Sequence, residues 1–174
     1  MISHVANILH FLGPPLDLVP DNEPARYWIH GLQLTVSDWV AEIHDIHHPI
    51  GPSLFYQQQQ QEAERRAVSF HKERLPRFLA YFEQVLALNP AGPGYLAGAD
   101  HCYADLSLFQ VIRGLQYAFP LAMKARRSSI PHTLALVERV AQRPNIKSYL
   151  QSDRRQPFNE SGIFRHYPEL DSSS

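Results

Sequence analysis

Apolar side chains recur at intervals of three and four residues through most of this chain, which is the spacing that gathers them on one face of an α-helix. No stretch alternates apolar and polar residues for long enough to predict a β-strand. The pattern therefore predicts an all-α protein whose helices pack as a bundle. The expected helices cover residues 2–12, 22–47, 58–88, 103–119, 131–142 and 144–150. The expected core row of the 22–47 helix is Trp28, Leu32, Val36, Trp39, Val40 and Ile43.

Proline and glycine mark the boundaries between these helices. Gly13-Pro14-Pro15 ends the first helix, because proline cannot continue a helix that glycine has terminated. Pro76 lies inside the 58–88 helix, where it removes a backbone hydrogen bond, so we expect that helix to bend. The expected divisions are a short helix over 1–12, a linker over 13–21, a helical domain over 22–152 and a C-terminal tail over 153–174.

Composition changes this picture little, but it excludes some classes of function. Of the 174 residues, 44% are apolar and 19% are charged, with a formal net charge of −1. A chain without a strong positive charge is not expected to bind nucleic acid. No apolar stretch approaches the roughly 20 residues that a membrane-spanning helix needs, so no membrane partner is expected. One cysteine and no recognisable targeting signal favour a cytoplasmic protein.

Three histidines gather at the end of the 22–47 helix, as His44, His47 and His48, and Tyr56 follows beyond the turn. His44 and His48 have the four-residue spacing of a helical metal-binding pair. Pro49 disfavours helical geometry at His48, however, and no further acidic or cysteine cluster completes a site. The sequence therefore predicts no metal, and a solvated helix end is the simpler interpretation, since protonated histidines also suit the helix dipole.

Three stretches, in this order and spacing, resemble the cytosolic glutathione transferase family. Residues 94–100 (Gly-Tyr-Leu-Ala-Gly-Ala-Asp) and 103–109 (Tyr-Ala-Asp-Leu-Ser-Leu-Phe) are similar to the loop and core-helix start of its C-terminal domain. Ile130-Pro131 with residues 140–150 resembles the closing pair of helices. Residues 2–13 are similar to the last helix of the family's thioredoxin-like domain. The resemblance implies the helical C-terminal domain, with residues 1–12 as a remnant of a thioredoxin-like domain that is otherwise missing.

Asp105 is expected to play a structural role at the start of the 103–119 helix. It lies three residues after Cys102, which is the position of the acidic member of a capping box. The family has Ser or Thr where this chain has Cys102, and a thiol is a poor acceptor, so this helix start is expected to lose about 1 kcal/mol. Cys102 itself is not expected to be a catalytic nucleophile, because no His–acid partner is apparent beyond His101.

The resemblance also implies where glutathione would bind. The group that stabilises the glutathione thiolate lies near the start of the thioredoxin-like domain, so we expect no catalytic residue in this chain. Two positions of the glutathione site would survive as a weak remnant, His4 and Val5, where the family has Gln or Glu followed by Ser or Thr. Since valine has no hydroxyl, the remnant is impaired. The sequence by itself does not establish transferase activity for this chain.

The same resemblance gives an alternative role to the histidine cluster. In similar proteins the end of the first long helix lines the pocket for the apolar electrophile, which would make His44, His47, His48 and Tyr56 pocket residues. The tail around Arg165, His166 and Tyr167 could cover that cleft. The implied partners are glutathione as a co-substrate rather than a cofactor, an apolar electrophile and a second copy in a homodimer.

Three functions remain open at this stage. The first is glutathione transferase chemistry in detoxification, to which this chain contributes the helical domain. The second is a non-catalytic protein-interaction module of the same fold, and the third is a fragment without an independent role. If a thioredoxin-like domain normally packs near the starts of the 22–47 and 103–119 helices, its absence predicts an exposed apolar patch that residues 2–12 would cover or that would drive self-association.

Overall fold

The computed structural model describes residues 1–171, and within them it contains helices and no strands. This confirms the all-α prediction. The α-helices are α1 (Val5–Leu12), α2 (Glu23–His47), α3 (Gln60–Ser69), α4 (Leu75–Ala87), α5 (Tyr103–Ala118), α6 (Pro120–Arg126), α7 (Pro131–Ala141) and α8 (Pro144–Leu150). Short 3₁₀ turns cover Pro14–Leu16, Tyr56–Gln58, Arg127–Ser129 and Pro168–Leu170. None of these helices is both long and apolar enough to cross a membrane.

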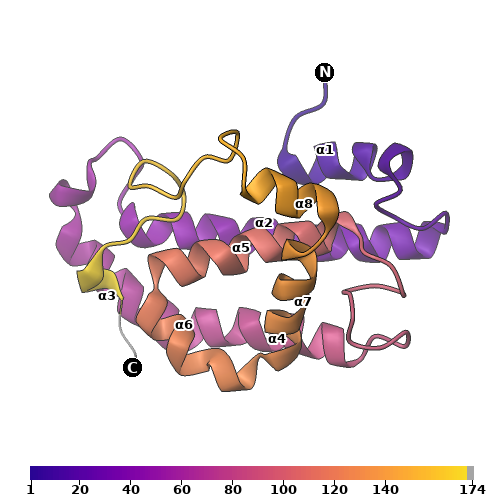
Figure 1. The fold of residues 1–174 in the computed structure, drawn as a ribbon. Coiled ribbons are helices and arrows are strands. Elements are labelled where there is room, and N and C mark those ends of the chain that lie inside the picture. The colour runs from indigo at the N-terminus through magenta and orange to yellow at the C-terminus, as the bar shows by residue number, and fades with distance from the viewer. Residues whose placement is uncertain (172–174) are drawn as a thin grey trace.

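The long helix α2 packs along α5, and α4 and α7 complete the bundle around them (Figure 1). The side chain of Asn22 caps α2 by accepting a hydrogen bond from the Ala25 N–H (3.0 Å), and Pro24 occupies the first turn, where proline is tolerated. The expected core row is buried at Leu32, Val36, Trp39 and Ile43 and partly buried at Val40.

Trp28 is the exception, since 49% of its surface is exposed and its predicted place in the core was wrong. It lies in the second turn of α2, at a surface groove of about 380 Å³ that it shares with Tyr81 and Leu88 at the end of α4. Periodicity identifies the apolar face of a helix. It does not show whether other elements cover that face along its whole length, and near the start of α2 they do not.

The predicted 58–88 helix is divided at the place where Pro76 was expected to bend it. A π-helix over Phe70–Arg74 joins α3 to α4, and the Leu75 N–H donates to the Phe70 carbonyl five residues earlier. Widening the helix just before a proline accommodates the missing N–H and the proline ring. The π-helix buries the Phe70 ring and the His71 ring inside the bundle.

Helix α6 was not predicted. Its start at Pro120 is stabilised from the far end of the chain, because the Asp171 carboxylate accepts from the Leu121 N–H (2.8 Å) and the Ala122 N–H (3.0 Å). A cap supplied from 50 residues away leaves no local signal in the sequence.

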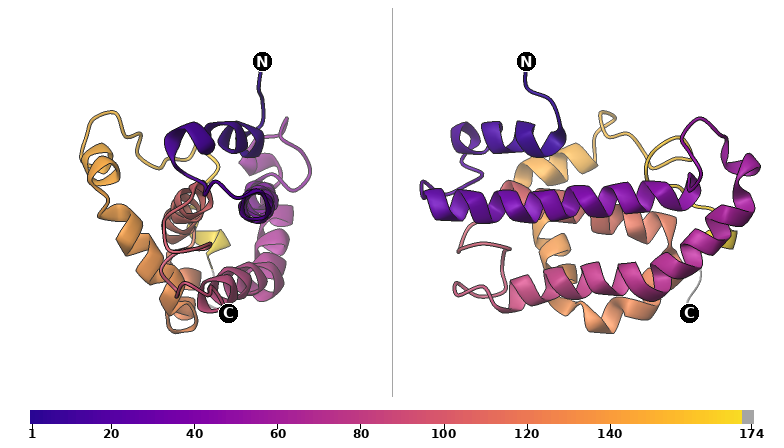
Figure 2. Two further views of the ribbon diagram at one scale, coloured as in Figure 1. Left: turned by 90° about the vertical axis from the view of Figure 1, so that its right-hand side faces the viewer. Right: turned by 180° about the vertical axis from the view of Figure 1, so that it is seen from behind.

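The first helix is shorter than expected, since α1 begins at Val5 instead of residue 2. His4, which precedes it, has a positive φ of 65°, a conformation that ends regular backbone structure there. Helix α1 lies along α2 on one side of the bundle (Figure 2). The connection to α2 is anchored where the Leu18 carbonyl accepts from the Tyr103 N–H (3.1 Å). The division of the chain into domains stays a prediction.

Candidate functional site

A cavity of about 920 Å³ lies between α1, α2, α5 and the C-terminal segment, which we define as residues 153–171. Most of its lining is apolar, and it is partly open to solvent. Its apolar residues include Val5, Ala6, Leu9, Leu34, Val36, Val40, Leu106, Val111, Pro157, Phe158, Ile163 and Phe164. Its polar residues include His4, Gln33, Ser37, Ser107, Gln110, Gln156 and Asn159. A concave, largely apolar site with a few polar groups is the usual form of a small-molecule binding site.

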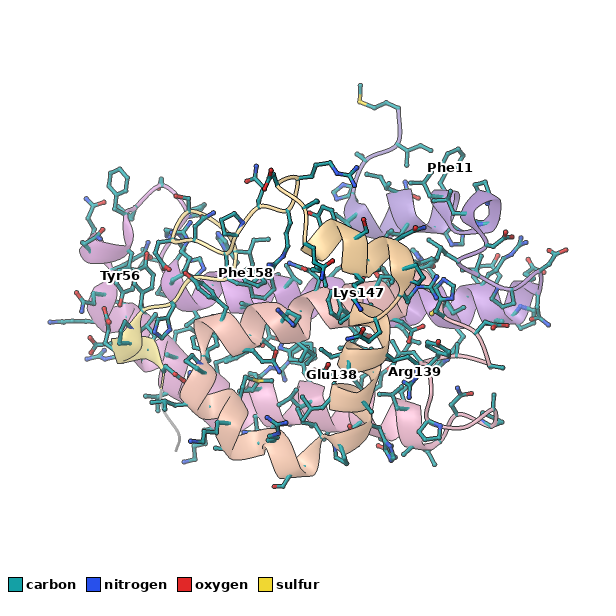
Figure 3. All side chains as sticks on the ribbon, in the orientation of Figure 1. Phe11, Tyr56, Glu138, Arg139, Lys147 and Phe158 are labelled. Carbon is teal, nitrogen blue, oxygen red and sulfur yellow. The ribbon has the colours of Figure 1, made fainter. Side chains whose placement is uncertain are left out.

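The C-terminal segment supplies one wall of this cavity through residues 156–164 (Figure 3, where Phe158 is labelled). The Phe164 ring packs directly on Gly114 of α5, where an added Cβ would meet ring atoms at 2.3 Å. Phe158 stacks against Tyr117 with ring centroids 5.2 Å apart, and the Tyr117 hydroxyl donates to Glu160 (2.6 Å). This wall therefore depends on one glycine of α5 and on aromatic contacts with that helix.

Two buried polar groups at the cavity have no hydrogen-bond partner within residues 1–171. They are the Tyr103 hydroxyl and the Gln33 side-chain oxygen, on residues that are 0% and 2% exposed. Burial raises the pKa of Tyr103 to about 12, so its hydroxyl stays neutral at physiological pH. Neither side chain therefore adds a fixed charge to the cavity.

The structure places both residues of the predicted glutathione remnant at this cavity. His4 and Val5 line it at the start of α1, and the Val5 side chain is 65% exposed. Their role in binding glutathione stays a prediction.

The predicted electrophile-pocket residues come together elsewhere. His44, His47 and His48 form a cluster at the end of α2, with ring centroids 4.9–5.2 Å apart. The C-terminal segment covers this cluster, since the His47 Nε2 contacts the Ile163 carbonyl (2.8 Å). None of the three lines the 920 Å³ cavity, whose wall on α2 comes from earlier turns.

Tyr56 also lies under the C-terminal segment (Figure 3). Its ring stacks on the Tyr167 ring at 3.8 Å, and its hydroxyl donates to the Glu169 carboxylate (2.8 Å). Burial raises the pKa of Tyr56 far above its ordinary value, and the hydrogen bond to Glu169 adds to this effect. In this structure Tyr56 holds the segment and does not face the cavity, so its assignment to an electrophile pocket stays a prediction.

Metal ligation gains no support from the histidine cluster. Among residues 1–171, no group of three or more His, Cys, Asp or Glu side chains is arranged to hold a metal ion. His48 is instead bonded to the Gln59 amide (3.0 Å), and His44 lies partly exposed beside Asp45 (3.3 Å).

Asp105 is fully buried at the start of α5. One carboxylate oxygen accepts from the Leu96 N–H (2.8 Å) and the other from the Cys102 N–H (2.7 Å), so the side chain joins the preceding loop to the helix. Burial raises the pKa of the Cys102 thiol well above its usual range, with the neighbouring Asp105 charge adding to it. The thiol therefore stays protonated, which does not suit a nucleophile.

The sequence interpretation missed the middle turns of α2 and α5 as cavity walls. A signal was present in α2, because Gln33 and Ser37 stand four residues apart next to the apolar row. Polar residues beside a helix core are usually taken as solvated, and only the position of α1 and the C-terminal segment shows that they face an enclosed space.

Comparison with known proteins agrees with the helical architecture. The family described as "Glutathione S-transferase, C-terminal domain" matches residues 44–153, and this chain belongs to it. Glutathione S-transferase P 1 of Xenopus laevis is 32% identical over 149 residues, which cover 86% of this chain and 62% of the relative. Glutathione S-transferase P 1 of Bufo bufo is 33% identical over 90 residues, or 51% of this chain and 41% of the relative.

A solved structure shares the fold. The Pi-class glutathione S-transferase of Onchocerca volvulus aligns with a TM-score of 0.66 at 22% identity, over 86% of this chain and 64% of that one. The chain spans about half the length of the curated relatives it matches, from 41% to 62% in these two examples.

Proposed function

We propose that this chain forms the helical part of a glutathione transferase and that its 920 Å³ cavity binds the apolar electrophile. The observation that carries the proposal is the cavity, which has the volume and the largely apolar lining of a site for a small hydrophobic molecule. Membership of the glutathione S-transferase C-terminal domain family supports the class of reaction. The relatives named glutathione S-transferase P 1 are longer than this chain, so the complete activity is part of the proposal.

The position of α1 supports a shared site for both substrates. His4 and Val5, the proposed glutathione remnant, line the same cavity as Val40 and Leu106. The backbone N–H groups at the start of a helix favour an anion such as a carboxylate, and the His4 side chain does not cap those of the eight-residue α1. We therefore place the glutathione end of the cavity at α1 and the electrophile end between α2, α5 and the C-terminal segment.

Filling the cavity tests this assignment. Ser107→Trp would add an indole to the cavity wall on α5, and we expect at least a ten-fold weaker affinity for an apolar fluorescent probe such as 8-anilinonaphthalene-1-sulfonate. Fluorescence titration measures the affinity. The matched control is Leu121→Trp, because Leu121 is 54% exposed on α6 and does not line the cavity.

Equal affinity in Ser107→Trp and wild type would place the probe elsewhere and remove the main support for the proposal. Weaker binding in both variants would show that an added tryptophan acts through the fold and not through the cavity, and this result would also count against it.

The second candidate is a non-catalytic interaction module, which is favoured by the outer face of α1. Phe11 of α1 is 59% exposed and Leu16, in the 3₁₀ turn that follows, is 57% exposed, and Figure 3 shows Phe11 on the side of α1 away from the bundle. Such a patch is typical of a surface that meets another protein or a second copy of the chain.

Light scattering with size-exclusion chromatography tests the proposed homodimer, and a Phe11→Glu variant tests whether this face forms the contact.

Glutathione assays separate the two candidates. Retention on immobilised glutathione, together with conjugation to an apolar electrophile, would favour the transferase. A folded chain that shows neither property, and that self-associates or binds a protein through α1, would favour the interaction module.

A further inference from the structure

Two buried histidines hold the C-terminal segment against the bundle. The His47 Nε2 at the end of α2 bonds to the Ile163 carbonyl (2.8 Å), and the His71 Nε2 in the π-helix bonds to the Leu170 carbonyl (2.8 Å). The two histidines are 2% and 1% exposed. Because a carbonyl oxygen only accepts, each ring must carry its proton on Nε2, which leaves Nδ1 as the unprotonated nitrogen.

Neither Nδ1 atom has a hydrogen-bond partner among the described residues. A second proton on either ring would therefore create a buried positive charge with an unsatisfied N–H donor, which is costly in a protein interior. The cost falls if the segment leaves, since its departure uncovers the Nε2 side of both rings.

We propose that His47 and His71 form an acid-sensitive attachment, whose protonation releases the C-terminal segment from the bundle and opens one wall of the cavity. The two histidines hold points seven residues apart along the segment, at Ile163 and Leu170. The cavity wall that the segment supplies, residues 156–164, ends at the first of these points. The effect of release on ligands depends on the proposed function, whereas the attachment itself does not.

The groups around His47 oppose its protonation. Burial is the main cause of its lowered pKa, which is about 4. The hydrogen bond to the Ile163 carbonyl raises the pKa in part, whereas the Arg165 charge on the segment and the neighbouring His48 and His44 rings lower it. Tyr167 of the segment meets the His47 ring edge-on at 6.5 Å and adds no charge. Release of the segment removes both the burial and the Arg165 charge.

The surroundings of His71 are mixed. Burial lowers its pKa and the Arg126 side chain of α6, which donates to the His71 carbonyl (3.0 Å), acts in the same direction. The hydrogen bond to the Leu170 carbonyl and the Asp171 carboxylate raise the pKa, and Asp171 is also bonded to the N–H groups at the start of α6. The π-helix that holds His71 also carries Lys72, Glu73 and Arg74, of which Arg74 pairs with Glu42 of α2 (2.6 Å).

The other attachments of the segment do not depend on a histidine proton in the same way. Tyr56 stacks on Tyr167 and donates to Glu169, and Phe164 packs on Gly114. His166 bonds through Nδ1 to the Ala118 carbonyl (3.0 Å), but its ring is only partly buried. Carboxyl groups in model peptides titrate near pH 4 and imidazoles near pH 6.5, so a change between pH 7 and pH 5 acts mainly on histidines.

The sign and size of the effect follow from His47. A histidine whose pKa is lower in the closed form than in the released form stabilises closure fully above pH 6.5, and this stabilisation falls as the pH drops toward about 4. For pKa values of about 4 and 6.5, the opening equilibrium shifts by about twenty-fold between pH 7 and pH 5 from His47 alone. His71 changes it in the same direction.

Amide hydrogen exchange of the whole chain tests the proposal. The Leu170 and Asp171 N–H groups are useful reporters, because they bond to the Tyr167 carbonyl (2.9 Å) and the Pro168 carbonyl (3.2 Å). Protection factors, corrected for intrinsic exchange at each pH, measure opening directly. We expect those of the segment to fall about twenty-fold or more between pH 7 and pH 5, while those of α5 stay constant.

Glutamine substitution provides the decisive comparison. In His47→Gln/His71→Gln each amide can still donate to its carbonyl but cannot titrate, so the protection of the segment should become independent of pH in this range. His132→Gln is the control, since His132 lies on α7 and no bond from its ring to the segment occurs in the part of the chain that the structure describes.

Three results would overturn the proposal. They are segment protection in wild type that does not change with pH, an equal fall in the double glutamine variant, and a parallel fall in α5, which would mean unfolding of the whole domain. If the double variant does not fold, the wild-type titration and the single His47→Gln variant decide the question. We expect His47→Gln to lose half or more of the change in the logarithm of the protection factor between pH 7 and pH 5. None of these readouts uses a ligand, so a failed cavity assignment would leave them unchanged.

Discussion

Asp105 shows how far individual residues of this chain could be interpreted from sequence. Its spacing from Cys102 predicted a bond to the backbone at the start of a helix, and the structure contains that bond (2.7 Å). The second bond, to the Leu96 N–H, was not predictable because it depends on the path of the preceding loop. His47 illustrates the opposite case, since its sequence position indicated a helix end but gave no sign of the segment that covers it.

Replacing Asp105 tests its structural role. We expect Asp105→Ala to lower the free energy of unfolding by about 2–4 kcal/mol, because it leaves two buried N–H groups without a partner. Chemical denaturation measures the change. Asp100→Ala, at an exposed position in the same loop, should change it by less than about 0.5 kcal/mol, and a similar loss in both variants would contradict the assignment.

Gly114 has no side chain, which lets the Phe164 ring of the C-terminal segment pack directly on α5. Gly114→Ala should lower the free energy of unfolding by about 1–3 kcal/mol, since its Cβ would overlap the Phe164 ring. Adding Phe164→Ala should cancel most of that loss, as a double-mutant cycle would show. Gly31→Ala on α2, where an added Cβ meets nothing within 4 Å, serves as the control and should not destabilise. Additive effects of the Gly114 and Phe164 substitutions would contradict the contact.

At the scale of elements, helices with a continuous apolar row of their own, such as α2, were predicted, whereas the short helix α6 was not. Helix α2 has its own cap and a continuous apolar row, and its predicted range was correct to within a residue. Pro76 predicted a bend in the 58–88 helix, and the structure has a π-helix just before it. Helix α6 was missed because its cap comes from Asp171 at the other end of the domain.

Helix α7 has a similar distant cap, and this one can be tested. The Glu83 carboxylate of α4 accepts from the His132 N–H (2.8 Å), the Thr133 N–H (2.9 Å) and the Thr133 hydroxyl (2.8 Å). We expect Glu83→Ala to lower the free energy of unfolding by about 1–3 kcal/mol, measured by thermal or urea unfolding. Glu138→Ala, at an exposed site on α7, should have little effect, and equal losses would show that Glu83 does not act as a cap.

At the scale of the whole molecule, the cavity is the feature that sequence could not reveal. Its walls come from residues 4–9, 33–40, 103–111 and 156–164, which only the fold brings together. The family resemblance predicted an electrophile pocket at His44, His47, His48 and Tyr56, and this stays a prediction. In the structure the C-terminal segment contacts His47 and Tyr56. The fold class was predictable because helical periodicity is local, and the site was not, because an enclosed space depends on the order in which helices pack.

The most direct test of the central claim is displacement of 8-anilinonaphthalene-1-sulfonate from the wild-type chain by S-hexylglutathione, followed by fluorescence at neutral pH. If the cavity binds an apolar electrophile next to the glutathione position at α1, the conjugate should displace the probe at a concentration at least ten-fold lower than glutathione does, because only the conjugate carries an apolar group into the space beside Val40 and Leu106. No displacement by the conjugate, or equal displacement by both compounds, would contradict the assignment.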